Sequence, residues 1–210
     1  MKGAFPGHGE TAYRWVIVGA LWLVHALVFM NISGLGIMAP YVKEELRLSS
    51  LQIGFLISAL STGAAFSQMP AGLLVDSAGA RRMLSLAVGA MGLFLFLFSG
   101  ASSFPIALGL LLLHGLTSGV ITPAASKSVL DWFPSVGRAT AMGVKQTGVN
   151  FGGIFAGMLL PFLAASFSWR QGLAAVGAVE MVALIPIYGL LRETSIRLKA
   201  PRVALEWGKI

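Results

Sequence analysis

Four ionisable side chains stand inside long apolar stretches of this sequence, where a charge is costly and usually signals a function. They are His25, His114, Lys145 and Glu180. An ammonium group can attract an anion, and an imidazole changes its charge near neutral pH. A carboxyl group buried in hydrocarbon can hold a proton. Binding of a small charged molecule and movement of a proton are therefore the chemistries that these residues could perform.

Lys145 has the most specific surroundings of the four. It lies two helical turns into its apolar block, roughly 10 Å from the start of that block. At 100° per residue it borders a narrow stripe of two amides and two small residues, namely Gln146, Asn150, Gly153 and Gly157. A cation beside two amides could receive a carboxylate, so Lys145, Gln146 and Asn150 are candidate ligand-binding residues. The alternative is that Lys145 extends to the membrane interface and serves only as an anchor.

The two candidate proton carriers have plainer surroundings. His114 lies near the middle of its block, and could contact a solute or carry a proton; the alternative is a hydrogen bond to a neighbouring helix. Glu180 is the only carboxyl group deep in an apolar block, so it is either a proton site or a neutral, hydrogen-bonded acid. His25 is expected in packing, and Asn31 lies on a different face of the same block.

Membrane-spanning helices must position these residues. Hydrophobic residues make up 56% of the 210-residue chain and charged residues 11%, whereas a soluble domain carries about 25% charged residues. Six apolar blocks could cross a hydrocarbon core of roughly 30 Å. They are 15–38, 52–75, 84–101, 104–126, 139–162 and 169–191. Barrel strands would alternate over about 10 residues, so an all-α integral membrane protein is predicted.

Composition also excludes several classes of function. So few charges could not cover a soluble enzyme, and the net charge of +7 comes mainly from the loops, which argues against a nucleic-acid partner. The chain has no cysteine, and no clustered ligands predict a metal or cofactor. No paired nucleophile and base supports an enzyme. The lipid bilayer is the first partner that the sequence indicates.

The distribution of Lys and Arg predicts the orientation. One set of loops is rich in these residues and the other holds only three, so both termini are expected in the cytoplasm and the protein in the inner, or plasma, membrane. The predicted organisation is a cytoplasmic tail over 1–14, a six-helix domain over 15–191 and a basic cytoplasmic segment over 192–210. Within the domain, three small-xxx-small pairs predict close helix packing. They are Gly115 with Gly119, Gly148 with Gly152, and Gly153 with Gly157.

The loop between the second and third blocks combines a turn with clustered charges. Gly79 can break the helix, and Asp76 stands at the membrane edge before the basic pair Arg81 and Arg82. We expect a charged latch between helix ends, with Arg138 or Arg81 as a local partner of Asp76.

This loop, including Gly72, resembles the signature loop of the major facilitator superfamily, G-x-x-x-D-R-x-G-R-R. Two departures are visible: Ser77 replaces a basic residue, and Ala80 displaces the basic pair by one place. Further segments are similar to bacterial members of the superfamily. These are 130–134, 138–143, 145–149, 152–153, 160–161 and 169–170. The similarity covers nearly all of 15–192.

The resemblance implies a secondary transporter of twelve helices in two halves, each half built of two inverted three-helix repeats. The chain is similar to the N-terminal half and would need a second six-helix half or a homodimer partner. The expected activity is transport of a small solute by proton-coupled or exchange alternating access, and the class of solute expected is an organic anion. The implied substrate-binding residues are Lys145, Gln146, Asn150 and His114, and the proton-coupling candidates are His114 and Glu180. The implied gating residues are Gly72, Asp76, Gly79, Arg81, Arg82 and Arg138.

Two other readings stay open. A six-helix membrane protein could act as a non-transporting assembly partner, which would need no solute contacts. The chain could also be an inactive truncated product, since a half alone would expose one wall of a polar cavity.

Overall fold

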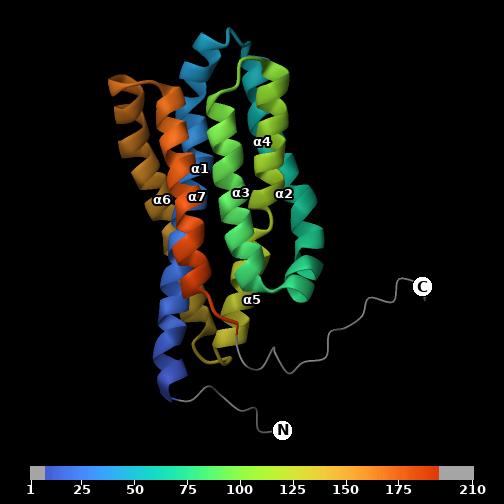
Figure 1. The fold of residues 1–210 in the computed structure, drawn as a ribbon, viewed down its shortest axis with the longest axis vertical. Helices are drawn as coiled ribbons and strands as arrows, with labels where there is room; N and C mark the ends of the chain where they lie inside the picture. The colour runs from blue at the N-terminus through green and yellow to red at the C-terminus, as the bar shows by residue number, and fades with distance from the viewer. Residues whose placement is uncertain (1–7, 194–210) are drawn as a thin grey trace, which may run out of the picture.

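A computed structural model describes residues 8–193, which form seven α-helices and no strand (Figure 1). The helices are α1 (His8–Glu45), α2 (Ser50–Ala78), α3 (Ala80–Ser99), α4 (Phe104–Ser118), α5 (Ile121–Trp132), α6 (Arg138–Ser166) and α7 (Trp169–Leu190). Six helical segments are long and apolar enough to cross a membrane, because α4 and α5 together form the fourth. The predicted all-α architecture with six spans is therefore confirmed.

Two of the predicted boundaries differ from the structure. The first helix begins at His8, so residues 8–14 continue the helix into the stretch expected as a tail. The fourth span continues to Trp132 and is broken at Gly119 and Val120. Pro123 follows this break and has no N–H to donate to the carbonyl of Gly119, which interrupts the regular hydrogen-bond pattern. Residues 1–7 and 194–210 lie outside the described part of the chain.

The helices pack mainly in three pairs, α1 with α6, α2 with α4 and α3 with α7. Two inverted repeats, in which spans one to three correspond to spans four to six, would produce this arrangement. Exchanging the two repeats turns the pairing of the first and fifth spans into that of the fourth and second. The same exchange leaves the pairing of the third and sixth spans unchanged. The packing thus has the pattern of two inverted three-helix repeats.

Glycines allow the backbones of each pair to approach closely. A Cβ atom on Gly115 would lie 2.2 Å from the carbonyl oxygen of Leu60, and one on Gly152 would lie 2.2 Å from that of Ala26. Two of the three predicted small-residue pairs therefore form helix contacts, on α4 and α6. The third pair does not, because a Cβ on Gly157 would meet nothing within 4 Å.

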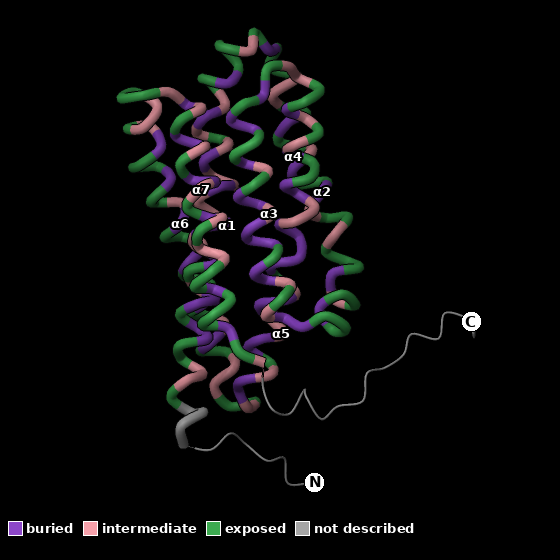
Figure 2. The backbone as a smooth tube through the Cα atoms, viewed as in Figure 1, coloured by how far each residue is buried: buried purple, intermediate pink, exposed green. Residues whose placement is uncertain are grey.

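Burial differs sharply between the helices (Figure 2). The spans of α2 and α6 are the least buried, and that of α1 is the most buried. Within the hydrocarbon-length parts of α3 and α7 the exposed side chains are apolar, as expected for contact with lipid. Exposed polar side chains occur instead on α2 and α6. Away from the ends of these helices they are Ser58, Ser61, Thr62 and Gln68 on α2, and Gln146, Thr147 and Asn150 on α6.

The two ends of the bundle can be named by the chain. The terminal end holds the start of α1, the turn at Gly79 and the end of α7, and the distal end holds the turn at 46–49 and the loops 100–103 and 167–168 (Figure 1). Both ends of the described chain therefore lie on one side, as an even number of spans requires.

Candidate solute site and gating loop

Lys145 is buried on the side of α6 that packs against α1. Its side chain is 3% exposed and shares that side with Gly148 and Gly152. Within the described part of the chain Lys145 has no hydrogen bond and no salt bridge. The aliphatic part of Lys145 is thus buried, while its Nζ is not fully enclosed and has no acidic partner in the described structure.

His25 of α1 lies within electrostatic range of Lys145. It is buried, and its Nδ1 lies 2.8 Å from the carbonyl oxygen of Leu21, one turn earlier in the same helix. A cationic imidazole here would repel the ammonium group. Two nitrogen-bearing side chains thus lie within electrostatic range of each other where α1 packs against α6, and an anion would be electrostatically favoured there.

Gln146 and Asn150 lie on another side of α6 and are exposed. Their neighbour Thr147 accepts a hydrogen bond of 3.0 Å from the indole Nε1 of Trp22, so α1 also borders this polar side. The structure therefore separates the three predicted ligands on α6: the cation faces α1, and the two amides face outward.

His114 lies in α4 with a side chain that is 0% exposed. Neither of its ring nitrogens has a hydrogen-bond partner among the described residues. The hydroxyls that share its helix are used locally, since Thr117 donates to the carbonyl of His114 and Ser118 to that of Gly115. The expected alternative, a hydrogen bond from this ring to a neighbouring helix, is not found in the described structure.

Glu180 forms a contact that the sequence reasoning missed. It accepts a hydrogen bond from the Nδ2 of Asn31, which joins α7 to α1 across 149 residues. Asn31 therefore contacts α7, whereas His25 lies within electrostatic range of Lys145 on α6. No periodicity in one helix could have named the partner on another helix.

The loop predicted to act as a gate turns at Gly79, whose φ of +100° is a conformation that L side chains rarely adopt. Asp76 forms a salt bridge of 2.9 Å with Lys127, a partner that the sequence analysis did not consider. The two proposed partners have other contacts: Arg81 donates from Nε to the carbonyl of Tyr188 at 2.8 Å, and Arg138 donates to the carbonyls at the end of α5. Of the remaining loop residues, Arg82 is exposed, and a Cβ on Gly72 would meet only open space.

Carbonyl groups at the end of α7 and just beyond it, at the terminal end, receive donors from three other helices. The donor and acceptor pairs are Arg81 with Tyr188, Tyr13 with Leu190, and Trp132 with Arg192, at 2.8, 2.7 and 3.0 Å. Because the last carbonyls of a helix have no partner within it, these contacts stabilise the end of α7 and connect it to α3, α1 and α5.

The distal end carries a matching contact. Arg170 forms a salt bridge of 2.6 Å with Glu45 and donates from Nη1 to the carbonyl of Ser99, the last residue of α3, also at 2.6 Å. Trp169 donates to the same carboxylate at 2.5 Å. This cluster joins the end of α1, the end of α3 and the start of α7.

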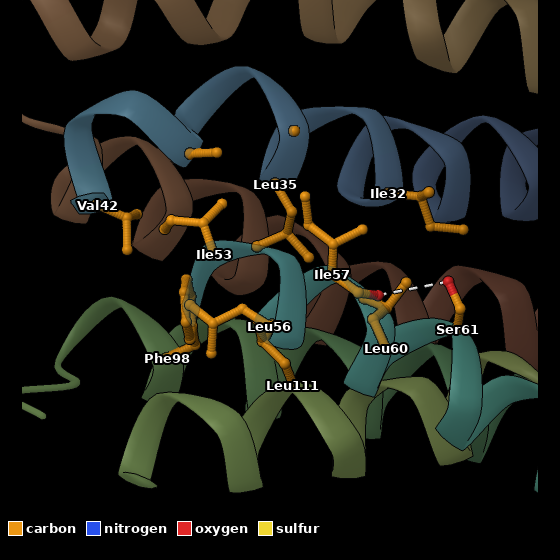
Figure 3. Close-up of a pocket in the computed structure, with 12 residues that line it drawn as sticks. Ile32, Leu35, Val42, Ile53, Leu56, Ile57, Leu60, Ser61, Phe98 and Leu111 are labelled. Atoms are coloured by element: carbon orange, nitrogen blue, oxygen red, sulfur yellow. Dashed lines mark hydrogen bonds between the residues drawn. The ribbon is translucent and has the colours of Figure 1, made fainter. Parts of the chain in front are cut away.

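A pocket of about 110 Å³ opens between α1 and α2 (Figure 3). Its lining is almost wholly apolar, and its one hydroxyl, that of Ser61, lies 3.4 Å from the carbonyl oxygen of Ile57. None of the predicted ligand-binding residues, which are Lys145, Gln146, Asn150 and His114, lines this pocket. The pocket is therefore separate from them.

The sequence model of the Major Facilitator Superfamily matches residues 21–209. The chain belongs to this superfamily. Among curated members, a hexuronate transporter of Bacillus subtilis is 28% identical over 173 residues, which are 82% of this chain and 41% of that protein. A gallate transporter of Pseudomonas putida is 28% identical over 194 residues, which are 92% of this chain and 43% of that protein.

Solved structures of the superfamily share the fold. A bacterial homologue of the human lysosomal transporter Spinster, inward-facing and unoccupied, gives a TM-score of 0.77 at 23% identity, covering 90% of this chain and 44% of that one. The proton:xylose symporter XylE gives 0.80 at 15% identity, covering 90% and 47%. The chain therefore spans less than half the length of these relatives. Its six membrane-spanning segments correspond to the N-terminal half of the fold, in a multi-pass membrane protein.

Proposed function

We propose that this superfamily member forms half of a carrier that moves a small organic anion across the inner membrane by alternating access. The observation that carries the proposal is Lys145, a buried cation without an acidic partner beside His25. The relatives support it, because those named for their solutes include transporters of hexuronate, galactarate or D-glucarate, sulfoacetate and gallate. Each of these solutes carries an acidic group.

In this proposal Lys145 attracts the carboxylate and the amides of Gln146 and Asn150 contact the rest of the solute. The two parts lie on adjoining sides of α6, so the solute would bind at the α1 edge of that helix. His114 is the candidate for proton coupling, because its ring is buried with both nitrogens unpartnered and a proton or a solute group would supply a contact. Exchange of two anions is the other coupling mode that the site would allow.

The polar faces of α2 and α6 support the need for a second six-helix half or a second copy of the chain. Seven hydroxyl or amide side chains away from the ends of these two helices are exposed, as named above. Ser61 and Thr147 already bond within the chain, but lipid could not hydrogen-bond to the other five groups. A protein partner or a water-filled cavity would satisfy these groups. The apolar exposed faces of α3 and α7 would then face lipid, with both termini in the cytoplasm.

Uptake of labelled galacturonate, D-glucarate and gallate tests the proposal. The cells should express the protein from its unmodified natural gene. Lys145→Ala should abolish uptake and Lys145→Arg should retain part of it, because only the second keeps a cation. Lys43→Ala is the matched control, since Lys43 is exposed at the distal end and bonds only to Ser50 in the described structure.

The amount of protein in the membrane must be measured for every variant. Loss of uptake that follows loss of protein would make Lys145 a structural residue. Full uptake by Lys145→Ala would end the anion-site proposal, and absence of uptake by the unmodified protein would favour the non-transporting assembly partner.

A further inference from the structure

Asn31 and Glu180 form a polar pair deep in the bundle that neither the proposed solute site nor the gating loop uses. Each side chain is 1% exposed. The Nδ2 of Asn31 donates to the Oε1 of Glu180, joining α1 to α7. The third side is closed by α3, where a Cβ on Gly92 would lie only 2.8 Å from the Cβ of Glu180.

Two atoms of this pair are left without a hydrogen-bond partner among the described residues. They are the Oδ1 of Asn31 and the Oε2 of Glu180, and both are buried. An ionised carboxylate has no donor, so it would leave both acceptors unsatisfied. A single proton on Oε2 changes this, because Oε2–H can donate to Oδ1 while Nδ2–H continues to donate to Oε1.

No positive charge faces Glu180 from the helices packed around it. In α3 the stretch 83–99 contains no titratable residue, and in α7 the nearest are Tyr188 and Arg170, eight and ten residues away, or about 12 and 15 Å along the helix. Arg170 is paired with Glu45. On α1 the nearest titratable residue to Asn31 is His25, six residues away and within electrostatic range of Lys145. Lys145 lies on the side of α6 that carries Gly148 and packs against α1. An ionised Glu180 would therefore be an uncompensated charge in hydrocarbon.

We propose that Glu180 is a proton-binding site: it holds one proton on Oε2 in the folded protein and forms, with Asn31, a neutral pair closed by two hydrogen bonds. The proton is a structural ligand that fixes α1, which borders the proposed solute site, to the α3–α7 pair. This inference is independent of the proposed function, because it requires no solute and no transport.

Infrared spectroscopy of the purified chain in lipid tests the proton directly. Near neutral pH the chain should show a C=O stretching band of a protonated carboxyl group, although its eight Asp and Glu residues would ordinarily be ionised. Glu180→Gln should remove this band, and Asn31→Leu should shift it toward the frequency of a free acid. Glu44→Gln is the control and should leave it unchanged, because Glu44 is exposed at the end of α1.

Thermal unfolding of the same variants tests the pair. Glu180→Gln should unfold at the temperature of the unmodified chain, because an amide can donate to Oδ1 and accept from Nδ2 as the protonated acid does. Glu180→Ala should unfold at a clearly lower temperature, since it leaves the Asn31 amide buried and unpaired.

A spectrum in which Glu180→Gln removes no protonated-carboxyl band would overturn the proposal. So would a loss of stability in Glu180→Gln as large as that in Glu180→Ala, because that result would require an ionised carboxylate. If Glu180→Gln cannot be purified, the presence or absence of the band in the unmodified chain, and its shift in Asn31→Leu, decide the question.

Discussion

The terminal and distal ends of the α3–α7 pair are held by the same kind of contact. At each end an arginine near the start of one helix donates to a carbonyl group near the end of the other. Arg81, the second residue of α3, donates to a carbonyl near the end of α7, and Arg170, the second residue of α7, donates to the last carbonyl of α3. Each guanidinium group also lies over an aromatic ring, that of Tyr188 at 3.9 Å and that of Trp169 at 4.6 Å. The helices are antiparallel, so each arginine satisfies the carbonyls that the other helix leaves free.

The two arginine contacts lie on either side of one point where α3 and α7 approach each other closely. The residues of each contact lie equally far along the two helices from that point. Gly92 and Gly177 touch: a Cβ on either would lie 2.6 Å from the carbonyl oxygen of the other. Arg170 lies seven residues before Gly177 and its acceptor Ser99 seven after Gly92, whereas Arg81 and Tyr188 lie eleven residues from the same two glycines. A two-fold relation between the inverted repeats therefore passes near this glycine pair.

The difference between the ends lies in their acids. At the distal end Glu45 joins Arg170 and Trp169, so the acid, the arginine and the capped helix form one cluster. At the terminal end Asp76 pairs with Lys127, and Arg81 binds α7 separately. The distal end is thus closed by one connected group, whereas at the terminal end the salt bridge of Asp76 stands beside three separate donors to carbonyls at the end of α7 and just beyond it.

Replacing Gly92 should have the largest effect, because it breaks the feature that both ends share. In Gly92→Ala the new Cβ would meet the backbone of α7 and the Cβ of Glu180, which cannot move aside as a flexible side chain would. Overpacking of this kind costs about 1–3 kcal/mol, and contact with backbone favours the upper part of that range. The free energy of unfolding in mild detergent measures it.

Gly72→Ala is the matched control for this prediction. A Cβ at Gly72 meets open space, and alanine favours a helix over glycine, so its stability should be equal or slightly higher. Equal loss of stability in both variants would mean that the α3–α7 contact is not the cause.

Replacing the two arginines separately should show that the distal end is the stronger one. Arg170→Ala removes a salt bridge and a capping hydrogen bond and leaves Glu45 with only the indole donor, which should cost about 2 kcal/mol. Arg81→Ala removes one hydrogen bond to a carbonyl and one cation–π contact, so a cost of about 1 kcal/mol is expected.

Unfolding of both variants at low and high salt checks this order. Added salt should narrow the gap, because only the contact of Arg170 includes an acidic partner. A larger loss for Arg81→Ala than for Arg170→Ala would contradict the view that the distal cluster closes this half.

The elements of this half could be predicted from composition, because hydrocarbon thickness fixes the length of an apolar span. The small-residue pairs that begin at Gly115 and Gly148 were also predictable, because close contact between helices requires small side chains. The pair at Gly153 and Gly157 was not distinguishable from them by spacing. Which side of a helix meets a neighbour depends on tertiary packing. For this reason the sequence could not show that Lys145 lies on a different side of α6 from Gln146 and Asn150.

Contacts between distant helices were the least predictable part of the candidate site. Asp76 could have paired with several cations near the same membrane edge, and nothing in the sequence singled out Lys127 over Arg81 and Arg138. Asn31 and Glu180 belong to different repeats, so no local pattern connects them. The only available signal was the cost of each polar group in an apolar block, which indicates that a partner exists without naming it.

Neutralising Asp76 should have the smallest effect on stability and a specific dependence on salt. Asp76→Asn removes the ion pair with Lys127, whose side chains are 61% and 30% exposed, so the expected cost is about 0.2–1 kcal/mol. That difference should shrink as salt is added, because exposed charges are screened. The double variant with Asp76→Lys and Lys127→Asp is the matched test, because it restores opposite charges across α2 and α5. If the pair acts as a contact between helix ends, the double variant recovers the stability of the unmodified chain. If the double variant remains as unstable as Asp76→Lys alone, Asp76 acts through its own turn at Gly79 and not through Lys127. The terminal end would then be closed by the contacts of α7 alone, which would make it more like the distal end.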